Sequence, residues 1–314
     1  MKNLRKRILS LLLAAVMTAS LLPTTAWAAT PPADDSEQYA YMQEILTELN
    51  GGLPENEGYT ESGPFQLGGS DVYFYELFRS VQNPSGGRVT DTRYVIVPGA
   101  GVTDAAMPDF DSVTDTPWRE SNPSGVYIAK GVTRIGKNSF TERTTLNTIK
   151  LQDPNSLKSI GEHAFDGCDA LEGPLDLSGV TQLGTHAFNG CEQLRKVTLG
   201  EGLTEIPNNA FNNCGLTTVN IPSTVTSIGD YAFSNNSLSE IRALALPEGL
   251  TYIGASAFAL QMGEGETSSG ITSLTIPASV KEIGANAFYG RRNLAEVTVT
   301  DDKVDGTKLT LGDG

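Results

Sequence analysis

Apolar and polar positions alternate along most of this chain in a pattern that repeats every 22 to 30 residues. Each unit begins with L-x-x-V-x-I, whose period of two is typical of a β-strand with one buried face. A second apolar pair, V-x-x-I-G, follows, and the unit closes with A-F-x-x-C, in which a small residue precedes a bulky one. The phenylalanines mark the register: Phe140, Phe165, Phe188, Phe211, Phe233, Phe258 and Phe288.

A period of this size predicts a solenoid, in which each unit buries a face on the next. We expect about seven coils over residues 126–299, each with a strand, a turn, a shorter strand and one helical or 3₁₀ turn that places the phenylalanine in the core. The period is irregular at three places: Pro207 replaces a glycine, residues 238–247 contain three extra residues, and residues 263–270 form a bulge. Such protruding loops often border a binding face.

Residues 29–97 predict a small α+β unit ahead of the repeats. Apolar residues from Gln38 to Asn50 follow helical spacing, and two glycines come directly after them. Residues 71–81 and 88–97 are rich in aromatic and β-branched residues around a turn cluster, which favours a β-hairpin. We expect residues 98–125 to form a cap that covers the apolar end of the first coil. Residues 300–314 are interpreted as a tail or as the start of a truncated coil.

Residues 1–28 have the layout of a secretory signal peptide, with four basic residues, a mostly apolar stretch and a small-residue run at Ala26–Ala28. The apolar stretch is shorter than the ~20 residues that span a bilayer, and no second one follows. We therefore expect a secreted, extracellular chain with no stable membrane insertion; association with the cell surface stays open.

The charge balance bears on the class of partner. The formal net charge is −15, and residues 1–28 hold four of the 22 basic residues and none of the 37 acidic ones, so the mature chain carries −19. Such a field repels nucleic acid, and we expect no nucleic-acid partner. An ordinary solvated extracellular surface has the same composition.

The cysteines and histidines occupy fixed positions in the repeat. Cys168, Cys191 and Cys214 each follow a phenylalanine by three residues. Their side chains should stack in a line and point the same way, which favours buried thiols over a disulfide or a tetrahedral zinc site. His163 and His186 each precede a phenylalanine by two residues, on a phase expected to face solvent, and no further ligand is apparent for a metal site.

The remaining candidate sites, for a cation and for a sugar, have little support in the sequence. Asp109, Asp111 and Asp115 depart from the EF-hand pattern, as do residues 301–306, although a weak cation site stays open in either. Trp118 is better explained by burial against the first coil than by sugar stacking.

An enzyme within residues 38–97 would have few groups to work with, and no two of them form a base and a nucleophile. No G-x-S-x-G elbow, P-loop or dinucleotide fingerprint occurs. We predict no enzymatic activity, no metal and no cofactor. The groups considered are Tyr73, Tyr75, Glu76, Arg79 and Tyr94.

The repeat unit, IPxxVxxIGxxAFxxCxxL in outline, resembles the BspA-like leucine-rich repeats of secreted and surface proteins of bacteria. Seven copies over residues 126–299 carry the resemblance, and the preceding MPDFDSVTDTPW is similar to the segment often found ahead of such repeats. The resemblance implies a curved, β-rich leucine-rich-repeat solenoid, display outside the cell, and an adhesive or partner-binding role. It implies no particular ligand.

The outward positions of the repeat strands are where we expect binding. Seven coils about 4.8 Å apart give a face of roughly 460 Å², against the ~800 Å² that each partner gives to a standard protein interface. A protein ligand would therefore also touch the 263–270 bulge or the N-terminal unit. The predicted ligand-binding residues are Lys150, Lys196, Thr198, Thr218, Asn220, Ser273, Thr275, Glu296 and Thr298 on the strands, and Glu264 and Glu266 in the bulge.

These observations predict a secreted, non-enzymatic binding or adhesion module that recognises an extracellular protein, peptide or glycan. The alternative is a structural spacer or scaffold that presents the N-terminal unit or a partner chain.

Overall fold

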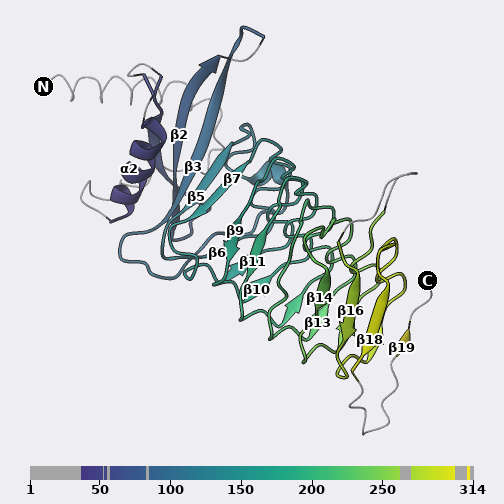
Figure 1. The fold of residues 1–314 in the computed structure, drawn as a ribbon. Helices are drawn as coiled ribbons and strands as arrows, with labels where there is room; N and C mark the ends of the chain where they lie inside the picture. Colours follow the sequence, from purple (N-terminus) through teal and green to yellow (C-terminus); the bar gives the residue numbers. More distant parts are fainter. Residues whose placement is uncertain are drawn as a thin grey trace, which may run out of the picture.

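Two sets of short parallel strands run the length of the molecule and form a β-solenoid with little helix (Figure 1). The computed structural model describes residues 37–51, 53–54, 57–82, 85–261, 270–300 and 310–311. A typical coil places one strand in a first sheet and a shorter strand in a second sheet, and returns through a turn that contains its phenylalanine. The predicted fold, a repeat solenoid preceded by a small α+β unit, is confirmed.

We call the outward surface of the first sheet the strand face, and that of the second sheet the second face. The first sheet, whose hydrogen-bonded ladder is interrupted after β7 and after β11, contains β5 (Gly125–Ile128), β7 (Thr148–Leu151), β9 (Leu175–Leu177), β11 (Val197–Leu199), β14 (Ala243–Ala245), β16 (Ser273–Ile276) and β18 (Glu296–Val299). The second, whose ladder is interrupted after β10, contains β4 (Ala105–Ala106), β6 (Val132–Ile135), β8 (Ser159–Ile160), β10 (Gln182–Leu183), β12 (Glu205–Ile206), β13 (Ser227–Ile228), β15 (Tyr252–Ile253), β17 (Glu282–Ile283) and β19 (Thr310–Leu311).

One coil departs from the predicted pattern, because residues 216–221 form no ladder strand although their sequence is among the most regular. Leu216, Val219 and Ile221 are still buried, so the inward positions pack as expected. The three extra residues of the next coil explain the difference. The backbone N–H of Glu240 donates to the carbonyl of Thr217 at 3.0 Å. This bond occupies the backbone acceptor at the start of the segment.

The phenylalanines stack in a continuous column through the core. Successive rings are 5.2 to 5.6 Å apart between centroids and lie within 17° of parallel. Trp118 extends the column by one step, since it stacks on Phe140 at 4.9 Å and donates its indole N–H to the Ser139 carbonyl at 2.7 Å. Only 1% of Trp118 is exposed. Its predicted burial against the first coil is therefore confirmed, and the sugar-stacking alternative is wrong.

The position three residues after each phenylalanine supplies a buried hydrogen-bond donor to the coil before it. The thiols of Cys168, Cys191 and Cys214 each donate to the carbonyl of the phenylalanine in the preceding coil, over 3.0 to 3.3 Å. All three are free and buried, as predicted, and burial raises the pKa of Cys168 and of Cys191. Asn236 and Arg291 serve the same purpose in later coils, at 2.7 Å each. This role explains the cysteines without any redox function.

The turn that holds each phenylalanine differs from the predicted helical or 3₁₀ turn. The residue two positions before the phenylalanine has a positive φ, between 53° and 59°, in all seven coils. A second left-handed residue follows two positions after it in most of them. Such residues cannot continue a right-handed helix, so the segment is a series of separate turns. Asparagine and histidine tolerate this conformation better than most residues, which accounts for both histidines.

Tyr231 is the bulkiest residue with a strained backbone at this position. Its φ is 57°, and 45% of the residue is exposed. Replacing Tyr231 by asparagine should raise the free energy of unfolding by about 1 kcal/mol, because a left-handed conformation costs an ordinary residue about that much. Urea denaturation followed by circular dichroism measures the change. Asn209 has the same conformation one coil earlier, with φ 56°, so Asn209→Tyr should lower stability by a similar amount; no loss there would refute the strain.

The N-terminal unit continues the first sheet, which the sequence did not predict. The predicted hairpin is present as β2 (Val72–Gln82) and β3 (Arg88–Pro98), paired antiparallel, with β1 (Thr60–Gln66) at its edge. Strand β3 then pairs in parallel with β5 of the first coil. The unit therefore shares one five-stranded sheet, in the order β1-β2-β3-β5-β7, with the first two strands of the strand face (Figure 1). The cap region adds a 3₁₀ turn at Val113–Asp115.

Helix α2 (Glu37–Asn50) lies on the strand face of this shared sheet (Figure 1). Tyr41, Met42 and Ile45 of the helix are buried against outward residues of β2, β3 and β5, which include Val95 and Tyr127. The main core lies on the other side of the same strands. The helix thus covers the first part of the face that we predicted to bind ligand. Within the described residues, no helix has the length and apolar character needed to cross a membrane.

Candidate ligand-binding face

The nine predicted ligand-binding residues that the structure describes all lie on the strand face. Parallel register brings them side by side between coils, with Ser273 opposite Glu296 and Thr275 opposite Thr298. Seven are exposed, and the other two, Thr218 and Ser273, are half-buried. Glu264 and Glu266 lie outside the described residues, so their role stays a prediction.

Most of the predicted side chains of this face have no partner within the described part of the chain. Threonines directly before the strands of either face, such as Thr226 and Thr272, donate their hydroxyl hydrogens to backbone carbonyls one coil earlier, at 3.1 Å each. In contrast, the eight predicted side chains that lie beyond β7 make no hydrogen bond or ion pair with any other described residue. They are Lys196, Thr198, Thr218, Asn220, Ser273, Thr275, Glu296 and Thr298. Their donors and acceptors are therefore available to a ligand.

Lys150 is the exception among the predicted residues. Its ammonium group forms an ion pair with Glu48 of α2, with the Nζ and Oε2 atoms 2.6 Å apart. No pattern in the sequence predicted that the helix would reach this strand. Lys150 therefore helps to hold the helix on the sheet, and the free part of the strand face begins beyond it.

Asp176 belongs to the face and was not among the predicted residues. It lies on β9 directly opposite Thr198 and is exposed. In Leu175-Asp176-Leu177, apolar and polar residues alternate as in the other strands, so this pattern could have predicted the outward position of Asp176. Ala243 and Ala245 occupy the equivalent outward positions on β14, so the side chains of that coil are too short to add polar contacts.

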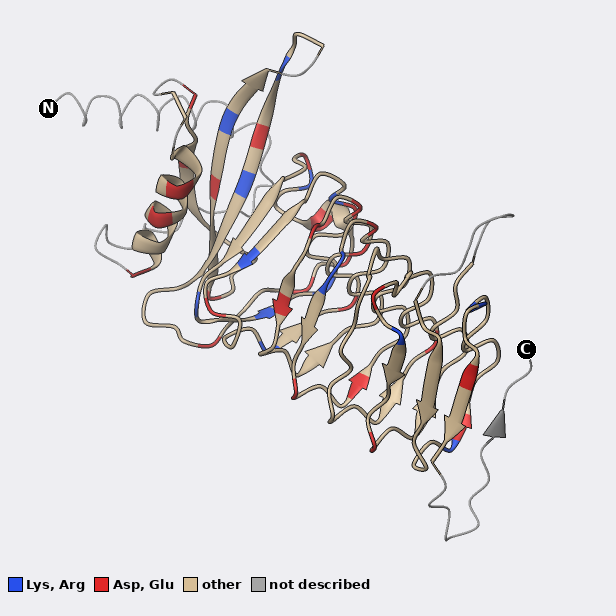
Figure 2. Ribbon diagram, in the orientation of Figure 1, with Lys and Arg blue, Asp and Glu red and all other residues tan. Residues whose placement is uncertain are grey.

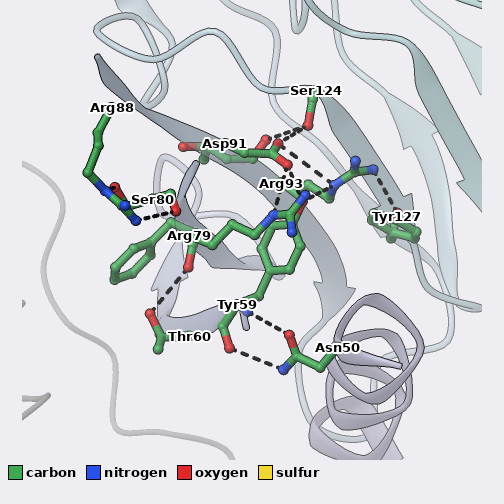
Figure 3. Close-up of polar contacts among 12 residues, drawn as sticks. Asn50, Tyr59, Thr60, Arg79, Ser80, Arg88, Asp91, Arg93, Ser124 and Tyr127 are labelled. Atoms are coloured by element: carbon green, nitrogen blue, oxygen red, sulfur yellow. Dashed lines mark hydrogen bonds and ion pairs between the residues drawn. The ribbon is translucent and has the colours of Figure 1, made fainter. Parts of the chain in front are cut away.

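A polar network joins α2, the hairpin and the first coil beside the strand face (Figure 3). The carboxylate of Asp91 accepts hydrogen bonds from the hydroxyls of Tyr59 and Ser124 and lies 3.4 Å from Arg79 and 3.9 Å from Arg93. Burial alone would raise the pKa of Asp91, but the hydrogen bonds from Ser124 and Tyr59 and the arginine charges outweigh it, so this pKa is lowered. The network fixes the N-terminal unit on the repeats.

The histidine pair is stacked, with ring centroids 4.6 Å apart. Nδ1 of His163 lies 2.7 Å from the carboxylate of Asp166, while burial and the neighbouring His163 ring lower the pKa of His186. The rings are half-buried, against the predicted solvent-facing position. No group of three or more His, Cys, Asp or Glu side chains in the described part of the chain is arranged to hold a metal ion.

The residues considered for cation binding and for catalysis do not converge. Asp109 already accepts hydrogen bonds from the Lys137 backbone and the Arg134 guanidinium. On the hairpin, the alternation of β-strands places Tyr75 and Arg79 on the strand face, whereas Glu76 and Tyr94 point to the opposite side. Burial raises the pKa of Glu76.

Comparison with known proteins bears on the family and the fold. No curated protein matches this chain. Among solved structures, a leucine-rich cell surface protein from Faecalibacterium prausnitzii is 20% identical, with a TM-score of 0.34, and the match covers 72% of this chain and 94% of that one. A leucine-rich repeat protein from Bacteroides ovatus is 19% identical, with a TM-score of 0.35 and coverage of 75% and 77%. The pneumococcal vaccine antigen PcpA is 17% identical, with a TM-score of 0.32 and coverage of 82% and 78%.

The family described as BspA type leucine rich repeat region matches in six copies, over residues 114–238, 175–295 and 266–305. These spans together cover more than half of the 314 residues. They coincide with the coils, the stacked phenylalanines and the strand face described above. The chain belongs to the BspA-type leucine-rich repeat family.

Proposed function

We propose that the protein is secreted and acts as a non-enzymatic binding or adhesion module. Its ligand is an extracellular protein, peptide or glycan, and its contact surface is the strand face from β9 to β18. Residues 1–28 would direct secretion as a signal peptide. Residues 126–299 would then form the recognition part and residues 29–97 its N-terminal unit, with residues 98–125 between them as a cap.

The observation that carries this proposal is the row of polar side chains along the strand face that have no partner among the described residues. Eight of the predicted side chains, from Lys196 to Thr298, form no hydrogen bond or ion pair there, whereas Thr272, directly before β16, donates its hydroxyl hydrogen to the preceding coil. A rigid surface with free polar groups binds without a large ordering cost, because its backbone is already fixed. Membership of a family built from stacked repeats supports the same role.

The test is a pull-down of extracellular proteins, peptides and glycans with the secreted chain. A variant with Thr198→Lys, Asn220→Lys and Thr275→Lys changes only outward positions, so it should keep the fold and lose at least 90% of the captured partner. The matched control carries Gln182→Lys, Thr204→Lys and Ser227→Lys on the second face and adds the same charge. It should bind normally. Equal capture by both variants would exclude this surface and favour the spacer role.

A further inference from the structure

We propose that Arg79 and Arg93 form a binding site for a carboxylate group of the partner protein, at the N-terminal end of the strand face. This inference rests on the proposed function, since it names a chemical feature of the partner. Figure 2 shows basic residues on both strands of the hairpin, in a chain whose formal net charge is −15. An acidic group on the partner would meet the local positive charge there.

The two guanidinium groups are held in place by their surroundings (Figure 3). Both lie over the ring of Tyr59, with their central carbons 4.8 Å and 5.7 Å from its centroid. Arg93 also donates from Nε to the Tyr59 hydroxyl at 2.9 Å and from Nη1 to the Tyr127 hydroxyl at 3.1 Å. Their side chains are 23% and 17% exposed, so the groups are confined yet still reachable.

The charges of this cluster do not balance. Asp91 is the one carboxylate in contact with the two arginines among the described residues. Its oxygens are also occupied by the hydroxyls of Tyr59 and Ser124. Both terminal nitrogens of Arg79, and Nη2 of Arg93, have no hydrogen-bond partner within the part of the chain that the structure describes. The cluster therefore carries one net positive charge and several free N–H donors.

A carboxylate fits this arrangement better than a phosphate or sulfate. Guanidinium groups bind planar oxyanions through paired hydrogen bonds, and one carboxylate neutralises one net positive charge. A dianion would leave excess negative charge in the field of an acidic protein. We therefore assign the site to an aspartate or glutamate side chain, or a C-terminal carboxylate, of the partner.

The site is continuous with the free part of the strand face. Arg93 is directly opposite Gly125, which is opposite Thr148 on the next strand. A Cβ atom at residue 125 would lie 2.8 Å from Nη1 of Arg93, so glycine there leaves room for the guanidinium. A partner that covers the later coils can reach the arginines along this row.

The test is a titration of the full chain with sodium acetate, observed through the arginine Nε–Hε signals in ¹H–¹⁵N NMR spectra. Sodium chloride and sodium sulfate at equal ionic strength run in parallel. Acetate should shift the Arg79 and Arg93 signals in a saturable way, with at least threefold higher affinity than sulfate. Absence of saturation overturns the site, and stronger sulfate binding overturns the carboxylate assignment.

Two variants make the assignment specific. Arg79→Gln should weaken acetate binding at least fivefold while the melting temperature stays close to that of the unaltered chain, because among the described residues Arg79 contributes one 3.4 Å ion pair with Asp91 and one contact over the Tyr59 ring. Arg88→Gln, on the same hairpin and bonded to Ser80, is the control and should leave acetate binding unchanged. Unchanged binding in Arg79→Gln would overturn the proposal. The strand-face variants do not alter this titration, so the two proposals fail independently.

Discussion

Replacing Phe188 by alanine should lower the free energy of unfolding by about 3–5 kcal/mol, the usual cost of removing a buried phenylalanine. Phe188 is fully buried and stacks between Phe165 and Phe211, at 5.2 Å and 5.5 Å. The neighbouring coils are fixed by backbone hydrogen bonds on both sides, so the core cannot collapse into the space that is left. Urea denaturation followed by circular dichroism measures the loss.

Phe288 provides the matched control at the other end of the column. It is half-buried and stacks only on Phe258 among the described residues, at 5.3 Å. Phe288→Ala should therefore cost less than half as much as Phe188→Ala. Equal losses would show that stacking within the column does not determine stability.

Replacing Gly184 by alanine should lower the free energy of unfolding by about 2–3 kcal/mol through overpacking. A Cβ atom at this position would lie 2.3 Å from the backbone nitrogen of Glu162 in the preceding coil, and backbone atoms there cannot move aside easily. The glycine of V-x-x-I-G is thus needed for the spacing between coils. Thermal unfolding measured by calorimetry tests this expectation.

Gly249→Ala is the control for that experiment. No atom lies within 4 Å of a Cβ built at Gly249, and its φ is not in the left-handed region. Its stability should change by no more than about 0.5 kcal/mol. A loss as large as that of Gly184→Ala would mean that glycine itself, and not the approach of two coils, explains the motif.

Much of the solenoid could be predicted from the sequence, because seven copies of one pattern indicate the same buried positions even where a single copy is irregular. Seven phenylalanines in one phase assign the inward and outward positions of every coil, and the nine predicted ligand-binding residues that the structure describes all lie on the strand face. The left-handed position could also have been predicted, since asparagine or histidine occupies it in Asn138, His163, His186, Asn209 and Asn286. These residue types are enriched in that conformation.

Contacts between distant segments could not be predicted in the same way. The pairing of β3 with β5, and the packing of α2 on the strand face, depend on a single copy of the N-terminal unit and leave no periodic signal. For that reason the ion pair of Lys150 with Glu48, and the grouping of Arg79 with Arg93, appear only in the structure. The role of the cysteines as hydrogen-bond donors could not be predicted from the repeat, because Cys, Asn and Arg, which differ in chemistry, all occur at the position three residues after the phenylalanine.

Cysteine labelling tests the central claim, that the strand face is the binding surface, most directly. The three native thiols are buried, so a single introduced cysteine reacts alone with a maleimide under native conditions. Thr198→Cys and Thr275→Cys place the thiol on the strand face, and Thr204→Cys places it on the exposed second face. With the partner captured in the pull-down present at saturation, labelling at residues 198 and 275 should slow at least tenfold, while labelling at residue 204 keeps its rate. Protection of residue 204 with unchanged labelling at residues 198 and 275 would contradict the account.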